Sequence, residues 1–196
     1  MKIAIGIAAL AATALALTGC SGSDDDASTA PTSGPTTVAD GPTSSAKPSI
    51  GNLDDPLCAA AQESLAVADT LESTAGDLQT MLQDPTFLTS TDVTALNAWG
   101  EDMLTLSGKT LTFYQTGVDE TAGEDVNADF VALTGFVSDY TITLAQAAAD
   151  AASPAEFMTT IQTAFADASV QDAATGAPAA GQNVATYLLD RCGQIG

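Results

Sequence analysis

The chain has 196 residues, of which 25 are acidic and 4 are basic, so its formal net charge at pH 7 is −21. A surface this acidic repels nucleic acid and anionic lipid headgroups, and we expect neither as a partner. The sequence contains no histidine, which excludes Ser-His-Asp and Cys-His catalytic arrangements, histidine-ligated haem and most kinds of zinc site. No glycine-rich phosphate-binding motif follows a predicted strand. We therefore expect neither enzymatic activity nor a cofactor.

The N-terminal stretch has the features of an export signal. Lys2 supplies one positive charge and residues 3–17 carry none, a run shorter than the roughly 20 residues that a spanning helix needs. The run closes with Leu17-Thr18-Gly19-Cys20, which resembles the lipobox of bacterial lipoproteins. The resemblance implies that the signal peptide, residues 1–19, is removed. An ordinary signal peptide with a cysteine near its cleavage site by chance is the alternative.

In bacterial lipoproteins the lipobox cysteine receives a diacylglyceryl group, so the resemblance implies lipidation of Cys20 with acyl chains such as palmitate. Two acyl chains are enough for stable anchoring. We therefore expect the protein on the extracytoplasmic face of the cell membrane, bound to it through this lipid. The Ala-, Thr-, Gly- and Asp-rich, Lys-poor composition resembles that of actinobacterial proteins, although a salt-adapted organism could have a similar one.

Residues 20–53 are rich in Ser, Thr, Gly, Pro and Asp, with hardly a large apolar side chain. Such a segment cannot bury enough surface to offset its ordering entropy, and we expect a disordered tether. Its root-mean-square span is on the order of 30 Å. The Ser/Thr/Pro content would also suit O-glycosylation, which composition does not decide. Residues 54–196 then have the length of one ordinary domain.

Capping signals and apolar residues at helical spacing predict the first two helices of this domain. Asp55-Pro56 combines an N-cap with proline at the first helical position, and Asp84-Pro85 ends the helix. A second helix begins near Thr91-Asp92 and leads to an acidic linker over residues 117–125. Within this second helix, residues 104–114 include a stretch of alternating apolar and polar residues that is also compatible with a strand.

The second half of the domain predicts further helices. A third helix covers residues 126–152, with a possible strand at 139–144. Ser153-Pro154-Ala155-Glu156 is a capping box that starts a shorter helix over residues 154–172. Gly176-Ala177-Pro178 is expected to break the chain before a last helix, which Gly193 ends.

With Cys20 assigned to the lipid, Cys58 and Cys192 remain, and such a pair in an oxidising compartment is expected to form a disulfide. The bond places the start of the first helix beside the end of the last one, and brings Arg191 near Asp54 and Asp55. The expected fold class is therefore all-α, an antiparallel up-down bundle of four to five helices stapled by one disulfide. A reactive thiol at Cys58, in the first turn of a helix, is the alternative.

The domain opens with Asp55-Pro56-Leu57-Cys58 and has a second cysteine late in the chain, an arrangement that resembles mycobacterial haemophore-like proteins. The resemblance implies a disulfide-stapled helical fold. It does not extend to haem binding, because the chain has no histidine to ligate the iron.

Two kinds of binding site remain as hypotheses. Oxygen-rich loops can hold calcium, although the acidic linker does not match the EF-hand spacing and a solvated loop is the alternative. An apolar cavity between helices could hold a lipid or another hydrophobe, with Tyr140 as its polar handle, although a filled core is equally compatible with the sequence. The candidate metal ligands are Asp119, Glu120, Glu124, Asp125 and Asp129.

The function that we expect is a non-enzymatic, lipid-anchored interaction or envelope module. The alternative is a carrier of a small hydrophobic ligand or a divalent cation.

Overall fold

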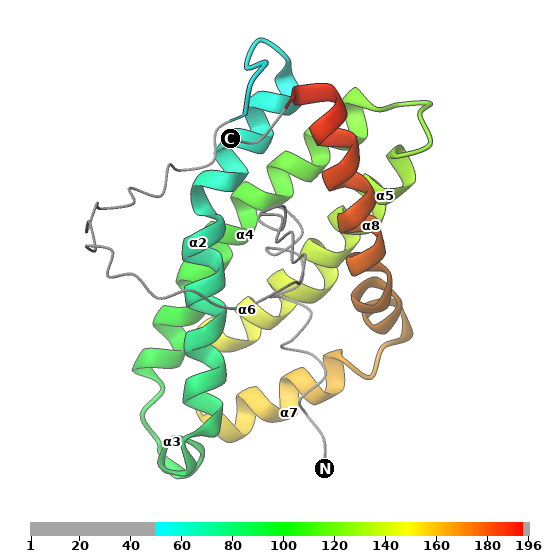
Figure 1. The fold of residues 1–196 in the computed structure, drawn as a ribbon. Coiled ribbons are helices and arrows are strands. Elements are labelled where there is room, and N and C mark those ends of the chain that lie inside the picture. Colours follow the sequence, from blue (N-terminus) through cyan, green and yellow to red (C-terminus); the bar gives the residue numbers. More distant parts are fainter. Residues whose placement is uncertain (1–49, 194–196) are drawn as a thin grey trace, which may run out of the picture.

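The computed structural model describes residues 50–193, so the expected signal peptide, Cys20 and most of the expected tether lie outside the described residues. Every regular element within that range is a helix (Figure 1). The elements are α2 (Pro56–Gln83), α3 (Pro85–Thr89), α4 (Thr94–Glu120), α5 (Asn127–Gly135), the π-helix η1 (Phe136–Ile142), α6 (Thr143–Ala149), α7 (Pro154–Ala164) and α8 (Ala168–Cys192). The α5, η1 and α6 segments follow one another without a break and form one helical rod. The expected all-α bundle is confirmed.

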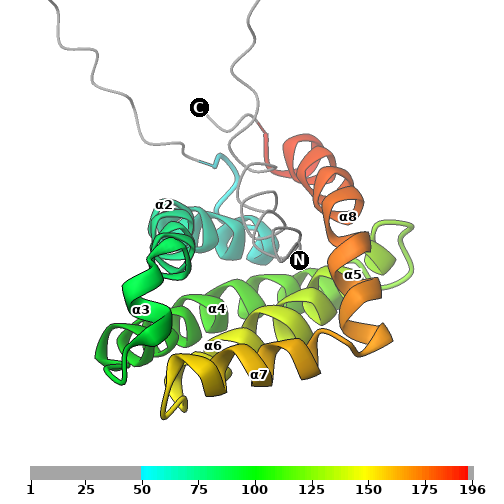
Figure 2. The same ribbon diagram turned by 90° about the horizontal axis from the view of Figure 1, so that it is seen from below.

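Four long members make up the bundle: α2, α4, the α5–η1–α6 rod and α8. The α4 helix packs against α2 and along the rod, and α8 packs on α5 and η1. Figure 2 shows α2 and α8 on one side of the layer that α4 and the rod form. The disulfide joins the N-terminal end of α2 to the C-terminal end of α8, as expected, and the two helices make few other contacts.

Side-chain caps fix the helix starts that the sequence predicts. Asp55 Oδ1 accepts hydrogen bonds from the amides of Leu57 and Cys58, and Pro56 occupies the first turn of α2. Ser153 Oγ accepts from the amide of Glu156, whose carboxylate accepts in turn from the amide of Ala152. Each cap satisfies amides that have no partner within the helix.

Both segments left open between helix and strand are helical. Residues 104–114 belong to the regular α4 helix, which continues to Glu120 and so takes up the first part of the expected linker. Residues 139–144 fall on the end of η1 and the start of α6. The β-branched and aromatic side chains that suggested a strand there therefore belong largely to a π-helix.

The expected chain break at Gly176-Ala177-Pro178 is wrong, because α8 continues through it. Proline removes one amide hydrogen bond and disfavours the preceding turn, at a cost of about 3 kcal/mol. Burial of one face of α8, which includes Ala177 and Ala180, offsets this cost, and the ribbon bends in this half of the helix (Figure 1).

The expected helix over residues 154–172 is also wrong in extent, since α7 ends at Ala164. A new helix, α8, begins at Ala168 because Asp167 Oδ1 caps it by accepting from the amide of Ser169 at 2.8 Å. Asp167 therefore provides a helix start that divides the predicted segment in two.

Close approach of backbones determines how α4 sits on the rod. A Cβ atom added to Gly100 would lie 2.4 Å from the amide nitrogen of Ala149 and 2.6 Å from the carbonyl oxygen of Ala145. Asn97 lies one turn earlier on α4. Its Nδ2 donates to the carbonyl oxygens of Ala148, Ala149 and Ala151, and these hydrogen bonds cap the C-terminal end of α6. Gly100 thus allows the backbones of α4 and α6 to approach closely, and Asn97 joins the two helices by hydrogen bonds.

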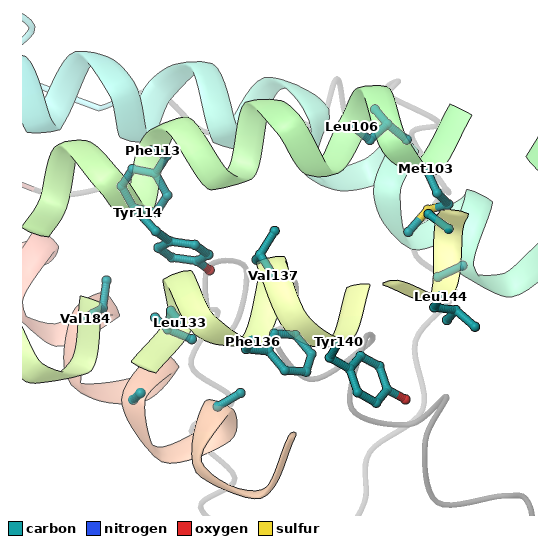
Figure 3. Packing of buried hydrophobic residues seen from close by; sticks show 14 of the residues in the cluster. Met103, Leu106, Phe113, Tyr114, Leu133, Phe136, Val137, Tyr140, Leu144 and Val184 are labelled. Carbon is teal, nitrogen blue, oxygen red and sulfur yellow. The ribbon is translucent and has the colours of Figure 1, made fainter. Parts of the chain in front are cut away.

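The core lies between α4, the rod and the helices that flank them (Figure 3). Its largest fully buried side chains include Phe113 from α4, Phe130 and Phe136 from the rod, and Phe157 from α7. Within residues 50–193 no helix is long and apolar enough to cross a membrane.

Candidate functional site: a hydroxyl-lined pocket beside the π-helix

A pocket lies where α2, α4 and η1 meet. Its enclosed volume is about 20 Å³, and the surrounding space, including the opening to solvent, is about 290 Å³. The enclosed part has room for one group the size of a water molecule. The pocket is lined by Leu71 from α2, by Ser107, Thr110 and Tyr114 from α4, and by Phe136, Val137 and Thr141 from η1.

Two hydroxyl groups in this lining are buried without a hydrogen bond. Ser107 is 1% exposed and Thr141 is 4% exposed, and within residues 50–193 neither Ser107 Oγ nor Thr141 Oγ1 has a partner. Leaving a buried polar group unpaired costs about 1–3 kcal/mol. Few such groups persist in native structures, and each one asks for an explanation.

Neighbouring hydroxyls show that this state is not a general property of α4. The usual partner of a helical Ser or Thr is the carbonyl four residues earlier. Ser107 does not make this bond, although four threonines on the same helix do. The residues that make the usual bond are Thr105, Thr110, Thr112 and Thr116.

The π-helix places Thr141 at the pocket. Hydrogen bonds from residue i to i+5 widen the turn, so residues five apart, such as Phe136 and Thr141, come onto one face. Val137 lies on that face too, and Figure 3 shows it opposite Tyr114 across the gap between the rod and α4. The result is a small concave surface lined by aromatic and aliphatic side chains and by hydroxyl groups.

The two tyrosines near the pocket differ in role. Tyr114 lines it, and burial raises the pKa of Tyr114 to about 12, so its hydroxyl stays neutral at physiological pH. Tyr140, the expected polar handle, is not part of this lining. Its ring is stacked between those of Phe136 and Phe165, with centroids 5.2 and 4.6 Å away, and burial raises the pKa of Tyr140 to about 12 as well.

The acidic candidates for a metal site are spread over several elements. Among residues 50–193 no group of three or more His, Cys, Asp or Glu side chains is placed to hold a metal ion. Glu120 lies near Arg191, with 3.5 Å between Oε2 and Nη2. Asp129 accepts from Asn183 on α8, and Glu124 and Asp125 are exposed. Asp119 borders an open surface groove beside Val131.

The cysteine expectations have different outcomes. Cys58 and Cys192 are joined in a disulfide with a Cα–Cα distance of 5.6 Å, and both are buried. This pairing excludes a free thiol at Cys58. Cys20, the expected lipidation site, lies outside the described residues.

The pocket residues were not identified from the sequence. Ser107 and Thr110 lie between Met103 and Tyr114 on one stripe of α4, so hydroxyls interrupt an otherwise apolar face. That interruption was the available signal, but the partner stripe with Thr141 depends on the π-helix. Comparison of the chain with protein-family models, curated proteins and solved structures gives no match.

Proposed function

We propose that this protein is a bacterial lipoprotein, a non-enzymatic binding module that acyl chains on Cys20 hold on the extracytoplasmic face of the cell membrane. The observation that carries this proposal is Leu17-Thr18-Gly19-Cys20 at the end of an uncharged apolar run. The buried disulfide between Cys58 and Cys192 supports an oxidising, extracytoplasmic location. A net charge of −21 means that the lipid, and not a basic patch, holds the protein at the membrane.

The role of the domain is interaction with a partner in the envelope. The acidic surface and the disulfide-stapled bundle suit a stable module displayed at the end of a tether. A pull-down from intact envelope is expected to recover a specific partner. Failure to recover one would count against this role while leaving the anchoring untouched.

The second candidate function is a carrier, and the hydroxyl-lined pocket is the observation that favours it. Its lining, among residues 50–193, combines apolar side chains with hydroxyls and includes no carboxylate, so it suits a small uncharged ligand. Ca²⁺ and Mg²⁺ need several oxygen ligands, with carboxylates prominent among them. The pocket therefore favours a hydrophobic cargo over a divalent cation.

Replacement of the lipidation site tests the anchoring. The Cys20→Ala variant is expected to move from the membrane fraction to the aqueous fraction, because it lacks the acyl chains. The matched control is the double variant Cys58→Ala, Cys192→Ala, which should stay with the membrane because Cys20 is intact. Retention of Cys20→Ala in the membrane fraction would overturn the proposal.

A further inference from the structure

We infer that the pocket between α2, α4 and η1 binds the terminal hydroxyl or carbonyl group of a small, uncharged apolar molecule, with Ser107 and Thr141 as its hydrogen-bond partners. This inference deepens the carrier function and rests on it for the biological role of the ligand. The geometry of the pocket is independent of how the protein is anchored.

The two unpartnered hydroxyls define the polar end of the ligand. Ser107 Oγ and Thr141 Oγ1 are buried, come from different helices, and line the same pocket. Each hydroxyl can donate one hydrogen bond and accept others. One oxygen atom placed between them would satisfy both, and this would remove the cost of two unpaired buried groups.

The walls define the rest of the ligand. Leu71, Phe136 and Val137 are apolar, and the lining, as far as the described residues form it, holds no charged side chain. Burying a carboxylate or an ammonium without an opposite charge is costly. The chain as a whole also repels anions, since its net charge is −21. The ligand is therefore neutral.

Size sets the third constraint. The enclosed volume of about 20 Å³ admits a single hydroxyl or carbonyl group, and the apolar part of the ligand must lie in the wider opening. A medium-length primary alcohol meets all three constraints, and octan-1-ol is a suitable probe.

The test is calorimetric titration of the full chain carrying Cys20→Ala. Octan-1-ol is expected to bind at one site per chain. Octanoate, which has the same chain length but a carboxylate, is expected to bind at least about tenfold more weakly because it must be desolvated without a cation.

Variants then locate the site. Ser107→Ala and Thr141→Val are each expected to weaken octan-1-ol binding by about tenfold, the effect of one lost hydrogen bond. Thr110→Val is the matched control. Thr110 lines the same pocket but already donates to the carbonyl of Leu106 at 3.3 Å, so its replacement should change the affinity by no more than about twofold.

Three titration results would overturn the inference: absence of octan-1-ol binding by the folded protein, equal binding by the Ser107→Ala, Thr141→Val double variant, or tighter binding of octanoate. A crystal structure with a water molecule as the sole occupant after soaking in octan-1-ol would do the same. None of these bears on the anchoring. Retention of Cys20→Ala in the membrane would contradict the anchoring alone, since the same chain extracted from the membrane still reports on octan-1-ol.

Discussion

Arg191 in the last turn of α8 donates from Nε to Oδ2 of Asp55, the N-cap of α2, across 2.8 Å. Its Nη1 also donates to the hydroxyl of Tyr187, and its Nη2 lies 3.5 Å from Oε2 of Glu120 at the end of α4. One cation thus joins the ends of three helices beside the disulfide. Its position at the C-terminus of α8 also complements the helix dipole.

This arrangement predicts a specific pH dependence of stability. Partial burial raises the pKa of Asp55, but hydrogen bonds from Arg191 and from the amides of Cys58 and Leu57 outweigh it, so the folded-state pKa lies below the ordinary value of 3.8. A carboxyl group whose pKa is lowered by folding stabilises the fold fully above its unfolded-state pKa. That contribution is lost as the pH falls through the folded-state pKa.

Asp55→Asn isolates the charge, because asparagine caps a helix about as well as aspartate. We expect its free energy of unfolding at pH 7 to be lower than that of the wild type by about 1 kcal/mol, the upper range for a partly exposed ion pair. The difference should begin to shrink as the pH falls below 3.8, and it should vanish once the pH lies below the lower folded-state pKa, where the wild-type carboxyl is also neutral. Urea denaturation at several pH values measures both effects.

Asp54→Asn is the control for this experiment, since Asp54 is the exposed neighbour. Its effect should stay within about 0.5 kcal/mol. A difference between wild type and Asp55→Asn that does not change with pH would contradict the role assigned to the Arg191–Asp55 pair.

The disulfide makes a larger contribution. The bond between Cys58 and Cys192 closes a loop with a sequence separation of 134 residues. Replacing both cysteines with alanine is expected to lower the free energy of unfolding by roughly 2–5 kcal/mol, mainly by releasing the unfolded chain. A reducing agent should destabilise the wild type by a similar amount and leave the double variant unchanged. Equal stability with and without the reducing agent in the wild type would contradict this prediction.

The features that the sequence predicts correctly are those whose physical cause is local. Asp55-Pro56 and the Ser153–Glu156 capping box start helices because their hydrogen-bond partners lie within four residues. The disulfide was predictable for a different reason, since the prediction that Cys20 carries the lipid leaves a single pair of cysteines.

The features that the sequence does not predict depend on packing. Proline favours a break at Pro178, yet burial of the face with Ala177 and Ala180 keeps α8 continuous. The pocket needs Ser107 and Thr141 to line one space, and they do so only because α4 packs on η1 and the π-helix brings Thr141 onto the face with Phe136. No local pattern specifies either outcome.

Gly100 provides a test of the packing between α4 and α6. Sequence propensity alone suggests that alanine would stabilise this helix, because glycine is unfavourable in a helix interior by about 1 kcal/mol. The structure predicts the opposite at Gly100, where a Cβ atom would lie 2.4 Å from a backbone nitrogen. Gly100→Ala is therefore expected to lower the free energy of unfolding by about 1–3 kcal/mol or more.

Gly108 is the matched control, because it lies on the exposed side of the same helix and an added Cβ atom would meet nothing within 4 Å. Gly108→Ala should raise the free energy of unfolding by about 0.5–1 kcal/mol. The two variants differ only in what the methyl group contacts. If both changes had the same sign, the close approach of α4 and α6 would be wrong.

Removal of the two pocket hydroxyls is expected to weaken ligand binding but not to lower the stability of the ligand-free protein. Ser107→Ala and Thr141→Val remove buried groups that lack a partner, so each should leave the free energy of unfolding of the ligand-free protein unchanged or raise it by up to about 1 kcal/mol. The comparison is Thr121→Val. Thr121 is fully buried, and its hydroxyl donates to the carbonyl of Gly117 and accepts from Asn127.

Thr121→Val should therefore destabilise the fold by about 1–3 kcal/mol, because it leaves the groups bonded to that hydroxyl unpaired. Thermal unfolding of the three variants without ligand and with octan-1-ol separates the two effects. A pair of hydroxyls that is costly when the ligand is absent and favourable when it is bound is expected of a binding site, where stability is given up for function. If Ser107→Ala and Thr141→Val destabilise the ligand-free protein as much as Thr121→Val does, those hydroxyls belong to the structural core and not to a ligand site.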